Sequence, residues 1–292
     1  DNGGVEAVIA ALARGLPRHG VHVEVACSSA GRVAEELRLE GVPVSTVRPD
    51  DLPAFLATSR PDAVQLHRVD PSLMAGLRAV ADRTVPVFHA MESYLDAAAW
   101  GALDALLARA PLSVSVSDSV RGFFADRVAL GPTRVIVNGA PPVAEPMERR
   151  RARALLSQAI GEDVGDDLLV AGLQRFSDQK NAPGLVDAFL LASERMPGAR
   201  LVVAGAPDSW LEFRRADVLR RLHPRGPRVH LLGDSDPRVV LSAADVFALD
   251  SFAEGGPLAA VEAAGIGLPL VLSDVGFARE LVQAGASGAV VP

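Results

Sequence analysis

The sequence contains a single cysteine, Cys27, and a single lysine, Lys180, and only 4% of its residues are aromatic. One cysteine excludes an internal disulfide and a zinc site built from cysteines, and it fits a reducing, cytoplasmic setting. No apolar run approaches the roughly 18–20 residues that a membrane-spanning helix needs. The formal net charge of −7 argues against a general nucleic-acid-binding protein, which would show a basic surface.

Apolar residues, chiefly Ala, Val and Leu, make up 49% of the chain and can form a substantial core. With 292 residues, the chain is long enough for two domains of ordinary size. One basic run, residues 148–153 (ERRRAR), departs from the acidic average. Such a run is typical of a solvated helix face, and contact with an anionic surface is the alternative.

Short β-rich runs alternate with helical stretches along nearly the whole chain, which predicts parallel α/β units. The alternation stops at a proline-rich linker, 141–152, and then restarts. We therefore expect an α/β fold with two Rossmann-like, doubly wound domains, 1–140 and 153–292, facing each other across a cleft, with ligands beyond the carboxyl ends of the strands. The expected strands are 22–28, 43–48, 62–67, 86–90, 112–117, 134–138, 168–174, 200–206, 228–233, 245–250 and 269–273. The expected helices are 5–15, 32–40, 72–82, 95–109, 118–127, 181–195, 209–222, 237–243 and 257–265.

Two glutamates, Glu254 and Glu262, lie around a predicted helix start in the segment DSFAEGGPLAAVEAAGIGLPLVLSD. Gly256 and Pro257 favour a helix start, and the free N–H groups there attract phosphate. Glu262 lies in a helix that is otherwise almost wholly apolar, so its carboxylate needs a partner. A nucleotide sugar, with hydroxyls on both sides of a diphosphate, would satisfy both glutamates. The structural alternative is that Glu254 caps the helix and Glu262 pairs with a core arginine.

Two cations, Arg175 and Lys180, lie in the loop QRFSDQKN after the first strand of the second block. At the carboxyl end of that strand they would hold a diphosphate and stabilise it as a leaving group. Taken alone, such charges are more often ordinary surface residues. In combination with the segment around Glu254 and Glu262, they favour the ligand interpretation.

Four segments together resemble the retaining GT-B glycosyltransferases of the family-four type (glycosyltransferase group 1): NGGVE at the start, VNGA at 137–140, RFSDQKN, and SFAEGGPLAAVEAAGIGLPLV with its Glu-x7-Glu spacing. The resemblance covers essentially the whole chain and is densest over 170–282. It implies transfer of a hexose, with retention of configuration and without a metal or other cofactor. The implied donor is a UDP-sugar, with GDP, ADP and TDP as alternatives. The acceptor would be a hydroxyl of a glycolipid, a polysaccharide or a natural product.

The resemblance also implies a role for individual residues. Glu262 would bind the ribose hydroxyls and Glu254 the sugar hydroxyls, while Arg175 and Lys180 neutralise the diphosphate. His89, at the end of a predicted strand, would face the donor sugar. We therefore predict His89, Glu254, Arg175 and Lys180 as catalytic residues. The backbone contacts to the donor are expected at Gly3, Gly4, Gly205, Gly233, Gly255, Gly256, Pro257 and Leu258.

Other polar residues are weaker candidates. His67 also ends a strand, whereas Asn138 and Ser117 are interpreted as turn or cap residues. The run DSD at 234–236 resembles a metal-binding Asp-x-Asp, but Pro237 follows, which is typical of a helix N-cap at Asp236. No Walker lysine motif, dinucleotide glycine fingerprint or zinc spacing is present.

The chain departs from the family pattern at Gln174 and Phe277, where glycine is usual. It lacks an initiator Met, and the resemblance implies a strand before residue 1 and helices after residue 292, so we expect both ends to be incomplete. Two other functions stay open: a nucleotide-sugar epimerase of the same fold, and a non-catalytic nucleotide-sugar-binding subunit. We expect a cytoplasmic protein, at the inner face of the membrane if it makes peripheral contact there.

Overall fold

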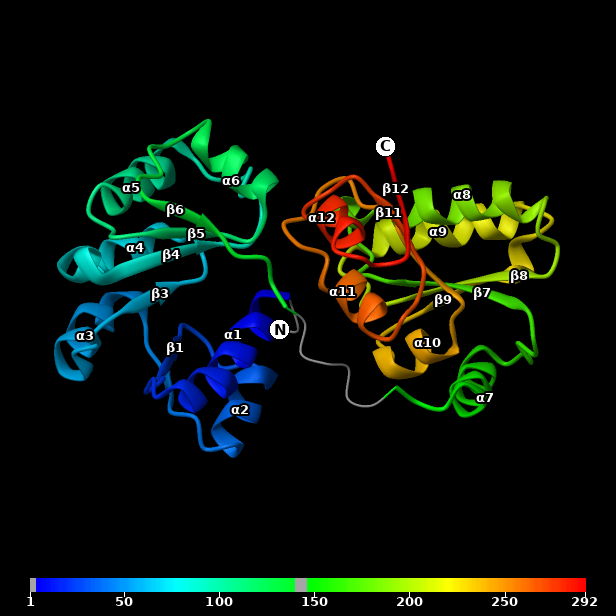
Figure 1. Cartoon of the computed structure of the whole chain (residues 1–292), viewed down its shortest axis with the longest axis horizontal. Helices are drawn as coiled ribbons and strands as arrows, with labels where there is room; N and C mark the ends of the chain where they lie inside the picture. The colour runs from blue at the N-terminus through cyan, green and yellow to red at the C-terminus, as the bar shows by residue number, and fades with distance from the viewer. Residues whose placement is uncertain (1–3, 140–145) are drawn as a thin grey trace. The chain divides into compact units, whose positions relative to one another are not determined.

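The structure is a computed structural model that describes residues 4–139 and 146–292. The chain divides into unit 1 (Asp1–Gly139) and unit 2 (Ala140–Pro292), both shown in Figure 1. Each unit consists of helices around parallel strands. This confirms the predicted α/β class with two Rossmann-like units. Gly3, Ala140 of the VNGA segment and residues 141–145 of the expected linker lie outside the described residues.

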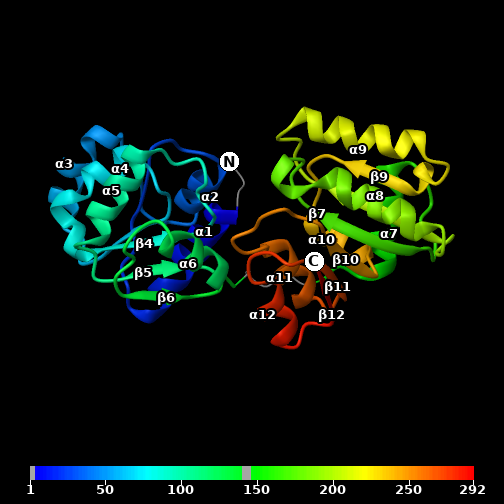
Figure 2. The same cartoon turned by 90° about the horizontal axis from the view of Figure 1, so that it is seen from above.

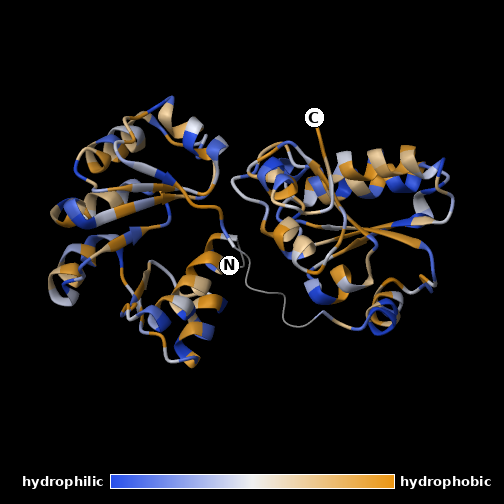
Figure 3. Ribbon diagram, in the orientation of Figure 1, coloured by the Kyte–Doolittle hydropathy of each residue, from blue (hydrophilic) through white to orange (hydrophobic). Residues whose placement is uncertain are grey.

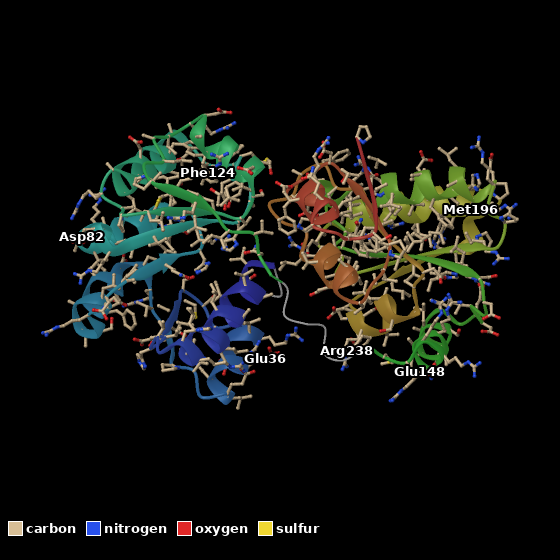
Figure 4. All side chains as sticks on the ribbon, viewed as in Figure 1. Glu36, Asp82, Phe124, Glu148, Met196 and Arg238 are labelled. Atoms are coloured by element: carbon tan, nitrogen blue, oxygen red, sulfur yellow. The ribbon has the colours of Figure 1, made fainter. Side chains whose placement is uncertain are left out.

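Unit 1 contains two separate parallel sheets, β1–β2 and β3–β4–β5–β6. The larger sheet packs on a core in which Phe88 of β4 stacks on Phe124 of α6, with ring centroids 3.9 Å apart (Phe124 is labelled in Figure 4). The smaller sheet rests on a minor cluster whose fully buried members are Ala10, Ala13 and Leu37. The elements are α1 Gly4–Gly15, β1 Val25–Cys27, α2 Arg32–Leu39, β2 Val44–Thr46, α3 Leu52–Ser59, β3 Val64–Leu66, α4 Pro71–Gly76, β4 Thr84–Phe88, α5 Ala97–Leu107, β5 Ser113–Ser115, α6 Asp118–Ala125 and β6 Thr133–Val135.

Unit 2 contains one parallel sheet of six strands in the order β12-β11-β10-β7-β8-β9. The chain starts in the middle of this sheet at β7, builds outwards through β8 and β9, and then returns to β10 on the other side of β7. This is the doubly wound order of nucleotide-binding α/β domains. The elements are α7 Arg149–Ile160, β7 Leu168–Leu173, α8 Ala182–Ser193, β8 Ala199–Ala204, α9 Trp210–Leu222, β9 Val229–Leu232, α10 Pro237–Ala243, β10 Val246–Leu249, α11 Leu258–Gly265, β11 Leu270–Ser273, α12 Ala278–Gln283 and β12 Gly288–Val291.

Helices cover both faces of this sheet, because alternate residues of a strand point to opposite sides. On β8, Leu201 and Val203 pack against α8 and α9, whereas Val202 and Ala204 pack against α7 and α10. A third cluster joins β10 and β11 to α11 and α12. Figure 3 shows the central strands as predominantly hydrophobic, as expected for strands buried on both faces.

Several elements differ from the sequence prediction. Helices α3 and α12 and strand β12 were not predicted. The basic run 148–153 was interpreted as a helix face, but α7 extends to Ile160, and residues 149–152, which we placed in the linker, form its first turn. Glu148 caps that turn by accepting the N–H groups of Arg150 and Arg151. Glutamate is not a typical N-cap residue, so the sequence carries no ordinary start signal there. No helix among the described residues is long and apolar enough to cross a membrane.

Candidate functional site

The candidate site lies at the carboxyl ends of β7 and β10, which are neighbours in the sheet of unit 2. The connection after β7 leads towards one edge of the sheet, and β10 begins the half that grows towards the other edge. Ligands of open α/β sheets bind at such a topological switch point, because the two diverging connections leave a crevice there. The loop after β7 carries residues 174–180, and the loop after β10 carries residues 250–257.

A buried ion pair joins these two loops. The Nζ of Lys180 donates to the Oε1 of Glu254, a carboxylate only 6% exposed. The hydroxyl of Ser251 donates to the same oxygen over 2.9 Å. Glu254 does not cap α11: Pro257 occupies the N-cap position, and no described side chain caps that end. The sequence therefore predicted Lys180 and Glu254 separately, and the structure shows that they pair with each other.

Glu262 lies on α11, one turn beyond its start, and is half-buried. Among the described residues it has no side-chain hydrogen bond or ion pair, so it does not pair with a core arginine, which was the structural alternative. Burial raises the pKa of its carboxyl. A desolvated carboxylate without a protein partner is costly, and hydroxyl donors from a ligand would relieve that cost.

Gln174 holds the β7 loop in place from a buried position. Its Nε2 donates to the carbonyl oxygen of Lys180 over 3.0 Å. Its Oε1 is buried and accepts no hydrogen bond from any described residue. The larger side chain at this departure from the family pattern therefore fixes the loop backbone next to the Lys180–Glu254 pair.

Ser273, the last residue of β11, fixes the backbone of the β10 loop. Its Oγ accepts the N–H of Ser251 over 3.0 Å and donates to the carbonyl oxygen of Ser251 over 2.9 Å. Both serines are buried. Ser273 thus positions Ser251, and Ser251 in turn positions the carboxylate of Glu254.

Arg175 takes a different partner from Lys180. Its Nη1 lies 2.5 Å from the Oδ2 of Asp208, in the loop after β8, and both side chains are substantially exposed. Surface pairs of this kind contribute little to stability. Arg175 is therefore held at the strand ends but can exchange its partner at small cost.

Two glycines of the site are required by close packing. A Cβ on Gly256 would lie 2.2 Å from the ring of Phe277, which is fully buried. A Cβ on Gly205, whose φ is +155°, would lie 2.1 Å from the carbonyl oxygen of Gln174. Phe277, the second departure from the family pattern, thus explains the glycine at position 256.

The other predicted backbone positions lie near these residues or at another element. The N–H of Gly205 donates to the carbonyl oxygen of Gly233 over 3.1 Å, so the ends of β8 and β9 meet. Gly255 precedes Gly256 in the turn before α11, and Leu258 is the first residue of that helix. Gly4 begins α1 in unit 1.

In unit 1, the two histidines at the strand ends contact each other directly. The Nδ1 of His67 lies 2.9 Å from the Nε2 of His89, and the Nε2 of His67 lies 3.0 Å from the Oε1 of Gln65. Burial lowers the pKa of each histidine to about 4, so both are neutral at pH 7. With the Gln65 oxygen accepting from His67, its Nδ1 accepts from His89, and the Nδ1 of His89 keeps its lone pair.

Two of the predicted cap residues, Asp236 and Ser117, are confirmed. Asp236 accepts the N–H of Arg238 at the start of α10, and Ser117 accepts the N–H of Val120 in α6. Within residues 4–139 and 146–292, no three His, Cys, Asp or Glu side chains form a cluster that could hold a metal ion.

Sequence reasoning missed the neutral residues that hold the charged ones. Gln174 was noted only as a departure from the family pattern, and Ser251 and Ser273 lie in the segment around Glu254 and Glu262 without a predicted role of their own. Each of the three lies at or just after the carboxyl end of a strand in unit 2. That position was the available signal. It marks the edge of the sheet where ligands bind.

Comparisons with known proteins agree with this geometry. Residues 2–142 match the family described as "Glycosyltransferase Family 4", and residues 157–292 match "Glycosyl transferases group 1". The D-inositol 3-phosphate glycosyltransferase of Mycobacterium tuberculosis is 36% identical over 155 residues. That match spans 51% of this chain but only 30% of the mycobacterial protein.

Solved structures share the fold across both units. Anabaena Alr3699/HepE in complex with UDP-glucose gives a TM-score of 0.81 at 20% identity, covering 100% of this chain and 82% of that one. A glycosyltransferase from Rickettsia africae gives 0.83 at 15% identity, covering 99% and 81%.

Proposed function

The chain belongs to the group 1 glycosyltransferases of the family-four type, with the GT-B fold, and from this premise we propose that it transfers a hexose from a nucleoside diphosphate sugar to a hydroxyl acceptor. Uridine is the base we propose first, and the UDP-glucose bound to the structurally similar Anabaena protein supports it. GDP, ADP and TDP are the alternatives that the test below includes.

The proposal is carried by one observation: Glu262 is a half-buried carboxylate on α11 without a described protein partner, beside the switch point of the sheet. A ribose offers two neighbouring hydroxyl donors, and these would satisfy both carboxylate oxygens. Hydrogen bonds to a charged group contribute about 1.5–3 kcal/mol each. Hydrogen bonds of this strength would compensate for the partial loss of hydration that burial imposes on the Glu262 carboxylate.

When the donor binds, Lys180 and Glu254 would each gain a contact with a different part of it. Without the donor, the ammonium of Lys180 is neutralised by Glu254. A diphosphate offers Lys180 a second anionic partner, and Arg175 can leave the exposed Asp208 for the same group. The carboxylate oxygens of Glu254 then become available to the sugar hydroxyls, while the two cations stabilise the departing diphosphate.

The finer features of the reaction follow the family resemblance. We propose retention of configuration, by attack of the acceptor on the face from which the diphosphate leaves, without a metal ion. The diphosphate would help to deprotonate the acceptor, and His89 would contribute to catalysis. The acceptor would be a glycolipid, a polysaccharide or a small natural product, encountered in the cytoplasm.

Calorimetric titration with UDP, GDP, ADP and TDP tests the donor site directly. We expect one diphosphate to bind in the micromolar range, and Glu262→Ala and Lys180→Ala each to weaken it by about 1.5–3 kcal/mol, as charged hydrogen bonds should. Glu194→Ala, at the exposed end of α8, is the matched control and should bind like the parent. If all four diphosphates fail to bind, or both variants bind like the parent, the donor site is wrongly assigned.

Turnover with the corresponding nucleotide sugar separates the transferase from the two rival functions. An epimerase would alter the sugar without an acceptor, and a binding subunit would leave it unchanged with every acceptor. His89→Ala should retain diphosphate binding and lose transfer. Equal transfer by His89→Ala and the parent would remove His89 from the catalytic residues.

A further inference from the structure

Helix α9 has an outward face composed of large apolar residues and arginines. Its inward side packs against α8, and Figure 2 shows α9 at the outer margin of unit 2. With 3.6 residues per turn, the residues that point away from the core fall on a single arc of the helix. We call this arc the α9 face; its residues are Trp210, Leu211, Arg214, Arg215, Val218, Arg221 and Leu222.

The four apolar side chains of the α9 face are well exposed: Trp210 is 62% accessible, Leu211 59%, Val218 49% and Leu222 80%. Single exposed apolar residues are ordinary, but four on one arc of a 13-residue helix form an apolar strip, which Arg214 and Arg215 interrupt between Leu211 and Val218. Exposed strips of this kind mark surfaces that contact another phase or molecule.

Charge on this helix is segregated. Its two acidic residues turn inwards, where the side chains of Glu212 and Asp217 are 7% and 13% exposed. Glu212 pairs with Arg215 over 2.7 Å, and Asp217 pairs with Arg220 and Arg221. The α9 face itself therefore contains no carboxylate, although the chain as a whole carries a net charge of −7.

We propose that the α9 face is a docking surface for an anionic lipid bilayer. A strip of Leu and Val with Trp at one end suits the boundary between headgroups and acyl chains, where an indole ring is preferred. The three arginines place long apolar stems along the strip and would direct their charged ends to lipid phosphates. Arg214 has no ion pair among the described residues, whereas Arg215 and Arg221 are shared with the inward carboxylates of Glu212 and Asp217. The inference stands independently of the proposed transferase activity, because no residue of the donor site is part of it.

A second basic helix provides the contrast. On α7, Arg150 and Arg151 are exposed, but the large apolar side chain on its exposed surface, Leu155, is only 38% accessible. Arginines without an apolar strip would give weak, salt-sensitive attraction alone. We therefore assign docking to α9 and use α7 as the control.

Vesicle binding by the full chain tests the proposal. The Trp100→Phe variant leaves Trp210 as the sole tryptophan, and we expect its emission to shift to shorter wavelength with vesicles of phosphatidylcholine and phosphatidylglycerol (7:3) but not with phosphatidylcholine alone. Arg214→Gln combined with Arg221→Gln should weaken binding to the anionic vesicles by about 30-fold, since each arginine near such a surface contributes about fivefold. Leu222→Ser should weaken it by several-fold.

Matched variants act as controls in the same vesicle co-sedimentation assay. Arg150→Gln with Arg151→Gln on α7, and Leu39→Ser at an 89% exposed leucine of α2, should bind like the parent. The proposal is overturned if the parent does not bind anionic vesicles, or if the α9 and α7 variants lose binding equally. It is also overturned if the parent instead forms a dimer in sedimentation velocity that Leu222→Ser abolishes, because the face would then be a protein interface.

Discussion

The two units have the same fold class but support their polar residues in different ways. Unit 2 has one continuous six-stranded sheet, and its strand β8, between β7 and β9, is buried along its whole length. Unit 1 has two separate sheets whose strands are mostly three residues long, and the smaller sheet rests on the minor cluster around Leu37. The charged residues that we propose as the donor site are thus carried by the unit with the more continuous sheet.

The buried polar residues of the two units differ in the same sense. In unit 2, Asp245 accepts hydrogen bonds from Arg149, from Arg153 and from the N–H of Leu169, so ion pairs join α7 to the sheet. In unit 1, the corresponding buried group is the neutral pair His67–His89. The stability of unit 2 therefore depends on ion pairs such as those of Asp245, whereas that of unit 1 depends on His67 and His89 remaining neutral.

Each unit contains one of the two tryptophans, so the comparison can be tested unit by unit. Trp100 lies on α5 of unit 1 and Trp210 on α9 of unit 2. Replacing either with Phe leaves a fluorophore that reports the unfolding of one unit.

The largest expected effect comes from deleting a core ring in each unit. Phe88→Ala and Phe247→Ala should each lower the free energy of unfolding of their own unit by about 3–5 kcal/mol, because both rings are essentially inaccessible. Urea unfolding followed by Trp100 should detect only the first change, and Trp210 only the second. If both tryptophans report one coincident unfolding transition, and both substitutions shift it equally, the two units do not have independent cores.

The second-largest expected effect is a difference between the two units in how acidification changes their free energy of unfolding. Burial holds the pKa of His67 and His89 at about 4, below the ordinary 6.5. Folded unit 1 keeps both rings neutral, whereas its unfolded chain protonates them below pH 6.5, so the unfolded state binds more protons. Its free energy of unfolding should therefore fall between pH 7 and pH 5, by about 2 kcal/mol for each histidine. The raised pKa of the buried Glu92 carboxyl acts in the opposite direction and reduces this fall. Urea unfolding detected by Trp100 at the two pH values measures this change.

Unit 2 should respond less over the same pH range. Burial lowers the pKa of His230, which acts in the same direction, but burial raises the pKa of Glu262, which acts in the opposite one. The variant His67→Gln, His89→Gln should flatten the response of unit 1. A slope that persists in this variant would assign the acid sensitivity to other groups.

The smallest expected effect concerns a surface ion pair. Arg14 of α1 pairs with Glu40 over 2.6 Å, and both side chains are more than 40% exposed. Arg14→Ala should lower the stability of unit 1 by only about 0.2–1 kcal/mol, and less in high salt. A loss of several kcal/mol, measured with Trp100, would show that this contact supports the small sheet far more than its exposure indicates.

The sequence predicted the architecture and the charged residues of the site from patterns that are local. The alternation of strands and helices, and the spacing of Glu254 and Glu262, needed no knowledge of distant contacts. The bond between Lys180 and Glu254 crosses 74 positions of the chain. The hydrogen bonds of Ser273 with Ser251 join the end of β11 to the loop after β10. Such contacts depend on strand order, which short-range patterns do not encode.

The length and packing of helix α7 were missed for a related reason. The basic run 148–153 was interpreted as a solvated helix face, and only the contacts of Arg149 and Arg153 with Asp245 reveal that one side of the helix is anchored to the sheet. The histidine pair shows the same limit, because two strand-end histidines could be recognised in the sequence but their mutual hydrogen bond could not. The sequence thus predicted which polar residues lie at the strand ends, but not which of them contact one another.

The contact between Gly256 and Phe277 has a consequence for how sequences of this fold can diverge. Because the ring fills the space that a Cβ at position 256 would occupy, a substitution at 256 is tolerated only after the ring at 277 has been lost. The two positions are therefore expected to change together and in a fixed order. A lineage that has acquired the phenylalanine is committed to the glycine 21 positions before it, as long as the ring remains.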